Sequence, residues 1–562
     1  MRNESERELL LKRWGAMETE RSSWISHWRD LSEHLLPRNG RFFETDRNRG
    51  ISRINRIADN TGTRAVRILG AGMLGGLTSP ARPWFRLTTA DYDLSQYQPV
   101  KVWLAEVTRQ MQALMANSNV YRALHTTYEE LGVFGTHATT VLDDFDAGLH
   151  LYSHTAGEYA LATDYKGRVD TMGRKFQKTV RQLVEEFGYN NCSQSVRDAY
   201  DNQRYAEWRT VIHMVEPRAE RDTRSRLARD MPFKSIYLEE GGDENQLLRE
   251  SGFDRFRVLA PRWVITAQDI YGSSPGMEVL GDVRQLQHQQ LRKSQGIDYQ
   301  TRPPLQAPTS MKHAEVDILP GGVTYVDAAT QGGGIRSSFE ANIRLDFLLQ
   351  DIQDVRQRIN SGFNADLFLM LGNPADTRMT ATEVAERHEE KLLMLGPVLE
   401  RLHNELLDPL VQMAFDRLLT AGVLPPPPDE MAGSPIEVEF VSILAQAQRA
   451  IGLNGIDRFV GNLGVVAQMK PDVLDKFNVD EWADVYSDTL GIDPALIVGD
   501  DKVAIVRQQR AEQQAAAAAQ EQAAMMAETA AKLGSVDTSG KNAATDIINQ
   551  LSGYGSPAPY SF

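Results

Sequence analysis

Cysteine is almost absent from this chain, which carries a single one, Cys192, among 562 residues. One cysteine excludes an intrachain disulfide and any metal cluster built from cysteine ligands. The sequence therefore predicts a fold stabilised by its hydrophobic core, and it favours a reducing compartment or independence from redox state. A chain of this length is sufficient for roughly two to four domains and a sizeable core.

Long apolar runs are missing as well. No stretch of about 18 consecutive apolar residues occurs, so we expect no membrane span. The first residues, MRNESERELLLKRW, are charged and lack a small-residue cleavage site, which excludes a secretory signal. Hydrophobic residues make up 41% of the chain and charged residues 24%, which is typical of an ordinary globular protein.

An excess of basic residues is also lacking, since the formal net charge is −15. Tight binding of nucleic acid over most of a surface requires many lysines and arginines to neutralise phosphates. The composition therefore argues against such a protein. It leaves open a conduit past which DNA slides, where strong binding would act as a brake.

Motifs of enzymatic chemistry are either absent or better explained by structure. We find no Walker-type phosphate loop and no Ser/His/Asp or Cys/His set. The GxGxxG match at Gly70–Gly75 follows TRAVRIL, whose periodicity is helical, so close helix packing explains it better than a dinucleotide site. In the GxSxG match, Ser274 is followed by Pro275, which lacks the N–H that an oxyanion hole needs.

Ser274 is therefore better interpreted as a helix N-cap with proline at the first helical position. His150 and His154 lie in a strand-like segment, and Asp143, Asp144 and Asp146 match a calcium loop only in part. We expect no catalytic residue, no metal site and no cofactor. A hydrolase hidden behind these matches is the weakest alternative.

The first half of the chain predicts an α+β body. Helical periodicity and strand-like alternation occur in separate segments. Helices are predicted at 5–36, 55–78, 99–117, 120–134 and 174–188, and strands at 83–89, 136–145, 149–155, 158–164, 208–218, 233–240 and 253–263.

The second half is mainly helical. It opens with a long helix, 276–298, that has almost no apolar face, so a second copy of the chain is expected to stabilise it. A second helix, 335–360, follows after a segment, 299–334, that contains the hairpin pattern EVDIL–PGG–VTYVD. An apolar loop is predicted at 361–378.

The remaining segments continue this helical character. Thr380 and Glu383 form a Thr-x-x-Glu capping box that starts a long helix, which is expected to kink at Gly396-Pro397 and at Pro409. A proline spacer, a strand at 436–443, a helical module to residue 500, an Ala/Gln-rich helix at 501–533 and a disordered tail are predicted after it.

Five segments together resemble the portal proteins, or head-to-tail connectors, of short-tailed tailed bacteriophages. They are ERSSWISHWRDLSEHLLPRNGRFF (20–43), RILGAGMLGGLTSPARPWFRLT (67–88), YEELGVFGTHATTVLDD (128–144), the APRW…YGSSPGMEVLGDVRQLQ block (260–287) and RMTATEVAERHEEKLLMLGPVLERL (378–402). The resemblance covers most of residues 9–420.

The resemblance implies a mainly helical α+β portal fold that assembles as a cyclic homo-oligomeric ring, usually of twelve subunits, around an axial channel. The implied regions are the wing (1–275 and 380–424), the stem (276–298 and 335–360), the clip (299–334), the tunnel loop (361–379), linker and crown (425–500) and a C-terminal helix with tail (501–562). The implied partners are other copies of the chain, double-stranded DNA, terminase, a tail adaptor, and the major capsid and scaffolding proteins. The implied place is the capsid vertex, after assembly in the host cytoplasm.

The same resemblance assigns candidate residues to these regions. Channel candidates are Arg284, Arg292, Lys293, Arg336, Arg344, Arg356 and Arg378, tunnel-loop candidates are Phe363, Leu367, Phe368 and Met370, and clip candidates are Glu315, Asp317 and Tyr325. Ion pairs with Asp282, Asp346, Asp351 and Asp354 are the alternative for the central arginines. Deleting 361–378 is expected to leave ring assembly intact but to impair DNA packaging or retention. Another virion protein, such as an internal core or scaffold component, is the alternative for the whole chain.

Overall fold

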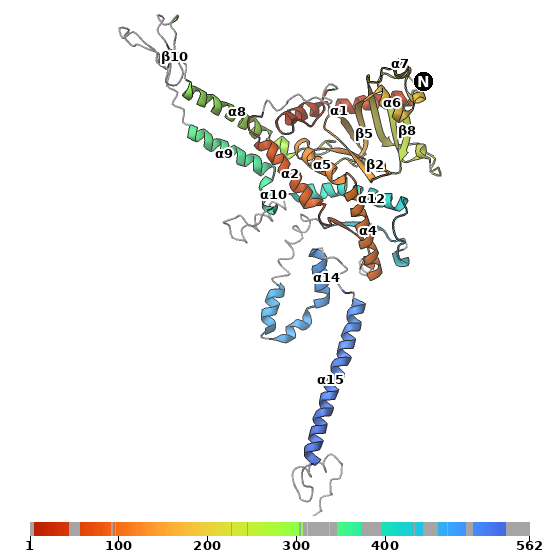
Figure 1. The fold of residues 1–562 in the computed structure, drawn as a ribbon, viewed down its shortest axis with the longest axis vertical. Coiled ribbons are helices and arrows are strands. Elements are labelled where there is room, and N and C mark those ends of the chain that lie inside the picture. Colours follow the sequence, from red (N-terminus) through yellow and green to blue (C-terminus); the bar gives the residue numbers. More distant parts are fainter. Residues whose placement is uncertain are drawn as a thin grey trace, which may run out of the picture. The chain divides into compact units, whose positions relative to one another are not determined.

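The computed structural model describes residues 5–43, 57–91, 94–95, 97–225, 227–243, 246–302, 305–306, 312, 336–337, 345–372, 395–431, 433–441, 459–468, 470–490, 498 and 500–534. The chain divides into two compact units, Met1–Gly491 and Ile492–Phe562. The first mixes helices and sheets, with helices in the majority (Figure 1). No helix of the described residues is long and apolar enough to cross a membrane.

Four helices of the first unit lie close to their predicted ranges. They are α1 (Glu6–His34), α2 (Thr61–Leu77), α4 (Gln98–Asn117) and α5 (Val120–Phe134). The Ser5 side chain caps α1 by accepting a hydrogen bond from the Glu8 amide, and Trp28 and Leu31 are buried on its inner face. Trp28 also donates its indole N–H to the Phe134 carbonyl at 3.0 Å, which ties α1 to the end of α5.

A five-stranded antiparallel sheet forms the second part of this unit. Its order is β4 (Tyr159–Thr163), β5 (Val169–Thr179), β6 (Trp208–Pro217), β7 (Phe233–Glu239) and β8 (Arg249–Phe253). Short helices α6 (Val180–Phe187) and α7 (Gln194–Asp201) cover one face, where Leu183 and Val196 pack with Val211 and Tyr237. Leu10 and Trp14, from the first half of α1, pack with Met214 and Leu238.

Two predictions in this region are wrong. The helix predicted at 174–188 begins only at Val180, because residues 174–179 continue β5 and pair with β6. Thr179 and Gln182 form a reciprocal capping box that ends the strand and starts the helix. The single strand predicted at 253–263 is replaced by β8, which the sequence did not indicate, and by the two-residue strand β9 (Val258–Leu259).

Smaller sheets join distant parts of the chain. β2 (Ala138–Asp144) lies between β3 (Gly148–His154) and β9. β1 (Phe85–Thr89) pairs with β12 (Ile436–Phe440) over five residues, so the strand predicted at 436–443 belongs to the same body as the N-terminal half. Short 3-10 helices occur at Tyr189–Asn191, Ala228–Asp230, Asp429–Met431 and Pro471–Lys476.

Two long helices, α8 (Pro275–Thr301) and α9 (Leu345–Gly362), pack side by side (Figure 1). The prediction that α9 begins at 335 is wrong, because Arg336–Ser337 form strand β11, paired with β10 (Leu305–Gln306). The loop predicted at 361–378 is also wrong in its first part, since Ala365–Gly372 form helix α10. The hairpin predicted at 315–327 and the capping box of Thr380 and Glu383 lie outside the described residues.

The helix that follows from residue 395 changes form where a kink was predicted. A π-helical turn, His403–Leu407, precedes α12 (Asp408–Thr420), whose second residue is Pro409. Proline cannot supply the amide hydrogen of a regular helix, and the wider turn accommodates this loss. The helix ends at Thr420, and Gly422, the predicted stop, follows with a φ of +67°.

The module predicted at 444–500 contains a helix at 459–468 and α14 (Val479–Leu490) in its described residues. The second unit contains α15 (Asp500–Gly534), the Ala/Gln-rich helix predicted at 501–533. Its described side chains are exposed except for the half-buried Val503, so it makes no core of its own.

Candidate functional site

The N-terminal half of α8 is packed into the core of its own chain. Val279, Leu280, Val283 and Leu286 are all buried in the main hydrophobic cluster. The expectation that a second copy must stabilise this helix is therefore wrong for its first turns, where a narrow apolar stripe is sufficient. The C-terminal half differs, because Leu291 is 53% exposed.

The start of α8 lies against the end of α5 and is joined to it by a hydrogen bond. Gly135 has a φ of +73°, and a Cβ there would lie 2.0 Å from the Gly272 carbonyl oxygen, so the two backbones cross without room for a side chain. Ser274 accepts a hydrogen bond from the Met277 amide and donates one to the Val133 carbonyl at 2.6 Å. Ser274 is thus the N-cap that its sequence indicated, with Pro275 at the first helical position.

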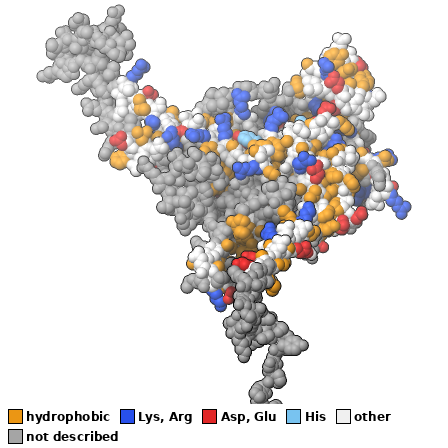
Figure 2. All heavy atoms as spheres, turned by 60° about the horizontal axis from the view of Figure 1, so that its bottom comes forward, with side chains coloured by type: hydrophobic (Ala, Val, Ile, Leu, Met, Phe, Trp, Pro, Cys, Tyr) orange, Lys and Arg blue, Asp and Glu red, His pale blue; other side chains and the backbone are white. Residues whose placement is uncertain are grey.

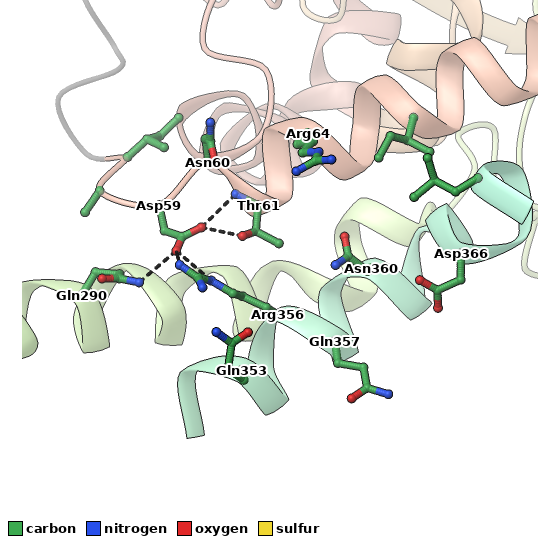
Figure 3. Close-up of a pocket in the computed structure, with 14 residues that line it drawn as sticks. Asp59, Asn60, Thr61, Arg64, Gln290, Gln353, Arg356, Gln357, Asn360 and Asp366 are labelled. Carbon is green, nitrogen blue, oxygen red and sulfur yellow. Dashed lines mark hydrogen bonds and ion pairs between the residues drawn. The ribbon is translucent and has the colours of Figure 1, made fainter. Parts of the chain in front are cut away.

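A polar brace joins α8 and α9 to the residues before α2. Asp59 pairs with Arg356 of α9 at 2.7 Å and accepts a hydrogen bond from Gln290 of α8 at 2.9 Å (Figure 3). Thr61 donates both its amide and its hydroxyl to the same carboxylate. Gln287 completes the brace, because its side-chain carbonyl accepts the amides of Ala58 and Asp59.

These partners decide the ionisation of Asp59, whose side chain is 5% exposed. Burial alone would raise its pKa, but the hydrogen bonds from Thr61 and Arg356 outweigh burial, and the pKa lies below its ordinary value. The carboxylate is therefore charged at neutral pH. It serves as the point where three separate segments meet.

An open cleft of about 920 Å³ lies beside this brace. Its walls are mostly amide and charged side chains from α2, α8, α9 and α10, including Arg64, Gln353, Asn360 and Asp366 (Figure 3). In the portion of the chain that the structure describes, no group of three His, Cys, Asp or Glu side chains is placed to hold a metal ion. The cleft offers hydrogen-bond donors and acceptors rather than a catalytic set.

The two candidate nucleophiles of the chain are also poorly placed for chemistry. Burial raises the pKa of the Cys192 thiol to about 11, so it stays protonated at neutral pH. The Ser274 hydroxyl is buried and committed to the Val133 carbonyl. The glycines of the GxGxxG match lie within α2, where Gly72 faces Phe368 and Gly70 faces Glu129.

The described channel candidates include residues that are bonded within the chain. Arg284 pairs with Asp30 at 2.9 Å, and Arg356 belongs to the brace. Arg292 donates to His288 and Gln295 of its own helix, while Lys293 is half-buried. On the face shown in Figure 2, Lys and Arg side chains are interspersed with uncharged and acidic ones and do not form one continuous basic surface.

The other channel candidates cannot be placed in the same way. Arg336 lies in β11, and Arg344 and Arg378 lie outside the described residues. The clip candidates Glu315, Asp317 and Tyr325 also lie outside them.

The tunnel-loop candidates are brought together, but in the core. Phe363 and Leu367 are fully buried and Phe368 is 6% exposed, and α10 packs on α2. Met370 lies on α10 as well. Deleting 361–378 would therefore remove core side chains, and we now expect it to disrupt packing instead of leaving assembly intact.

Sequence reasoning missed Asp59, Gln287 and Gln290 entirely. The Asp-Asn-Thr run at 59–61 is a helix-start signal, and it would have moved the predicted start of α2 from 55 to 61. Sequence reasoning also missed Arg262, which forms an ion pair of 2.6 Å with Glu405 of the π-helical turn. No local pattern reveals these partners, because each pair is far apart in the sequence.

Comparison with known proteins gives a consistent result along the chain. The sequence model of a family described as "Bacteriophage head to tail connecting protein" matches residues 7–498. The chain is 60% identical over 554 residues to the "Probable portal protein" of Bordetella phage BPP-1, covering 99% of this chain and 100% of that one. It is 45% identical over 547 residues to the "Portal protein" of Salmonella phage epsilon15, covering 97% and 98%.

Similarity to solved structures is weaker. A chain of "Virion of native gene transfer agent (GTA) particle" matches with 11% identity and a TM-score of 0.34, covering 73% of this chain and 87% of that one. A chain of "Neck of empty GTA particle computed with C6 symmetry" matches with 12% identity and a TM-score of 0.37, covering 76% and 92%.

Proposed function

This chain belongs to the bacteriophage head to tail connecting protein family, and on that premise we propose that it forms a closed ring whose axial channel carries double-stranded DNA. The ring stands at the capsid vertex, at the junction of head and tail. It conducts DNA into the capsid during packaging and out of it during ejection. The relatives called portal proteins, which match over nearly their whole length, are the observation that carries this proposal.

The regions of such a ring follow the described elements with adjusted boundaries. We assign α8 and α9 to the stem, since these two long helices pack on each other and bracket the clip segment, 299–334. The wing comprises the α+β body up to residue 275 together with α12. β12 pairs with β1 of that body, so we place the start of the crown after residue 441.

Contacts between subunits are expected where apolar side chains of the stem helices remain exposed in the single chain. The C-terminal half of α8 exposes Leu291 and Ile297, at 53% and 40%. Burying such side chains against a neighbouring copy is favourable by about 25 cal/mol for each Å² of apolar surface. A ring needs a heterologous interface that closes on itself, and this surface suits one.

The chain is proposed to act passively, as a channel and a docking platform. Terminase binds the clip during packaging and supplies the ATP hydrolysis, and a tail adaptor takes its place later. Major capsid and scaffolding proteins contact the outside of the ring. The Ser274 hydroxyl is occupied by its hydrogen bond to the Val133 carbonyl, and the Cys192 thiol is protonated. Both observations support a structural role without enzymatic activity.

Electron microscopy of the purified full chain tests the proposal. Class averages viewed along the axis are expected to show a closed ring of about twelve subunits with a hole wide enough for a DNA duplex. Monomers or open filaments at high protein concentration would contradict it and would favour an internal core or scaffold protein instead.

A further inference from the structure

A second cleft adjoins the first one and is lined by more basic than acidic side chains. It has a volume of about 540 Å³ and shares Ile57, Asn60 and Arg64 with the cleft beside the brace. Its charged lining residues are Arg38, Arg64, Arg67 and Glu129. The cleft therefore carries a local excess of positive charge on a chain whose net charge is −15.

The three arginines are free to bind a ligand. Arg38, Arg64 and Arg67 are exposed, and none of them forms an ion pair or a side-chain hydrogen bond with the described residues. Arginines of the neighbouring long helices are different, since Arg284 and Arg356 are each paired with an aspartate. Glu129 is a nearby counter-charge for Arg67, but three arginines outnumber it, so the remaining positive charge favours an anion in the cleft.

The chemistry of the lining matches a phosphate group. Arg64 and Arg67 are three residues apart on α2 and therefore lie on the same face of the helix. A guanidinium presents a planar fork of N–H donors that fits phosphate oxygens bidentately. Thr63 lines the same cleft, and its buried hydroxyl has no hydrogen-bond partner within the described part of the chain.

Glu129 is expected to weaken the binding of an anion in the cleft. It is the acidic side chain of the lining, and it lies 3.8 Å from His125. A carboxylate at this place repels an anion and lowers its affinity. Glu129 thus offers a substitution with an effect opposite to that of the arginines.

We propose that this cleft binds the phosphodiester backbone of double-stranded DNA through Arg38, Arg64 and Arg67. The proposal rests on the proposed function, because it names a contact of the DNA that the ring conducts. Contacts with phosphates alone position the duplex without recognising its sequence. A few such contacts, opposed by Glu129, provide a weak hold that does not stop the passage of DNA.

Fluorescence anisotropy with a labelled random-sequence duplex tests the cleft at several salt concentrations. The full chain is compared with the triple variant Arg38→Ala, Arg64→Ala, Arg67→Ala. We expect weaker binding and a salt dependence whose slope falls by about 1 for each arginine removed. Glu129→Gln is expected to bind the duplex more tightly than the parent.

A matched control removes three positive charges at positions outside the cleft. Arg82, Arg221 and Arg224 are exposed and lie outside both clefts, and their triple alanine variant is expected to bind the duplex like the parent. Equal losses in the two triple variants would mean a general charge effect and would overturn the proposal. Thermal unfolding of both variants checks that each is folded.

Competition experiments distinguish the DNA duplex from other negatively charged ligands. Poly-glutamate represents an acidic protein partner, and inorganic pyrophosphate represents a small phosphate compound. If either binds in a way that depends on the three arginines while duplex binding does not, the cleft serves that ligand and the proposal fails.

Images of the same samples distinguish this proposal from the proposed function. If the parent forms no closed rings, the proposed function fails, and the anisotropy comparison still decides whether the cleft binds DNA. If all variants form rings and the cleft variant binds the duplex like the parent, only the cleft proposal fails.

Discussion

The polar contacts of Asp59 attach the long helices α8 and α9 to the rest of the chain where few apolar contacts are made. It joins the segment before α2 to both long helices through Arg356 and Gln290. A buried carboxylate is costly unless hydrogen bonds and an opposite charge compensate it, and here several donors do so. The outward half of α8 is held to its own chain by such polar contacts, where its sequence offers few apolar ones.

Substituting Asp59→Asn is expected to lower the free energy of unfolding by about 1–2 kcal/mol, because Arg356 loses its counter-charge in a partly buried position. Urea unfolding measures this change. Asp354→Asn is the matched control, since Asp354 pairs with Arg358 one turn away but is 65% exposed, and a change below about 0.5 kcal/mol is expected. Equal effects of the two substitutions would contradict the importance of the brace.

The effect of Asp59→Asn on the free energy of unfolding is expected to depend on pH. The pKa of Asp59 is depressed in the folded state, so its stabilisation is present above the ordinary carboxyl pKa of about 4. It is lost as the pH falls through the depressed value. The difference in unfolding free energy between the parent and Asp59→Asn should therefore shrink in acid, which urea unfolding at a series of pH values would reveal.

Two buried histidines act in a different pH range. Burial is the main cause that lowers the pKa of His154 and His213, and Arg174 lowers both further. His213 accepts a hydrogen bond from Arg174 through Nδ1 and bonds Ser235 through Nε2, so its ring is neutral. The unfolded chain binds protons below about pH 6.5 that the folded chain does not, so these residues favour unfolding in acid.

His213→Gln is expected to remove one of these contributions. As the pH falls from about 6.5 toward 5, the loss of stability from each such histidine approaches about 1.4 kcal/mol per pH unit. The variant should show a slope smaller by this amount, whatever its stability at neutral pH. A slope in His213→Gln equal to that of the parent would contradict this role of His213.

At the scale of elements, α2 carries two glycines with opposite consequences. A Cβ at Gly72 would lie 2.2 Å from the Phe368 ring of α10, whereas a Cβ at Gly75 would meet nothing within 4 Å. Gly72 thus permits the close approach of α10. Gly75 has no such reason in the described structure.

Gly72→Ala is therefore expected to destabilise the chain by about 1–3 kcal/mol, because Phe368 and its helix must move. Gly75→Ala should be neutral or stabilising by up to about 1 kcal/mol, because alanine favours a helix over glycine. Thermal unfolding of the two variants provides the comparison. Similar destabilisation by both would mean that helix propensity, rather than the contact with α10, governs this region.

Helix α8 also shows why one prediction at this scale failed. Its sequence is mostly polar, which suggested that only another subunit could stabilise it. Val279, Val283 and Leu286 are nevertheless fully sufficient to anchor its first half in the core. Composition averages over the helix, whereas packing depends on where a few apolar side chains fall.

At the scale of the whole molecule, the chain consists of two units of unequal kind. The first contains the hydrophobic core, and the second contains α15, whose described side chains are largely exposed. Most of the stability of a helix in a protein comes from burying an apolar face, and the described side chains of α15 bury none.

A chain that ends at Gly491 is therefore expected to keep the thermal unfolding midpoint of the first unit. Its circular dichroism signal should lose the helical contribution of α15 only. A marked drop in the midpoint would show that the second unit supports the first. Imaging of the truncated chain would then establish whether ring formation depends on it as well.

Local signals in the sequence predicted much of the fold. The periodicity of α1, α4 and α5, the Ser274 cap and the stop at Gly422 depend on neighbouring residues, and all of these predictions are confirmed. The same is true of the strand at 436–440, although its partner β1 could not be inferred. The family, too, was recognisable from the sequence motifs.

The tertiary structure alone decided which distant residues meet. The Asp59–Arg356 brace, the Arg262–Glu405 pair and the burial of Phe363 join positions separated by many residues, and no local pattern encodes such contacts. The arginines of the second cleft belong to this class, because Arg38, which follows α1, and Arg67 of α2 line one cleft only in the folded chain. Sequence by itself determined many of the helices and strands, the charge and the family, since these depend on near neighbours and composition, whereas the sites depend on how the elements pack.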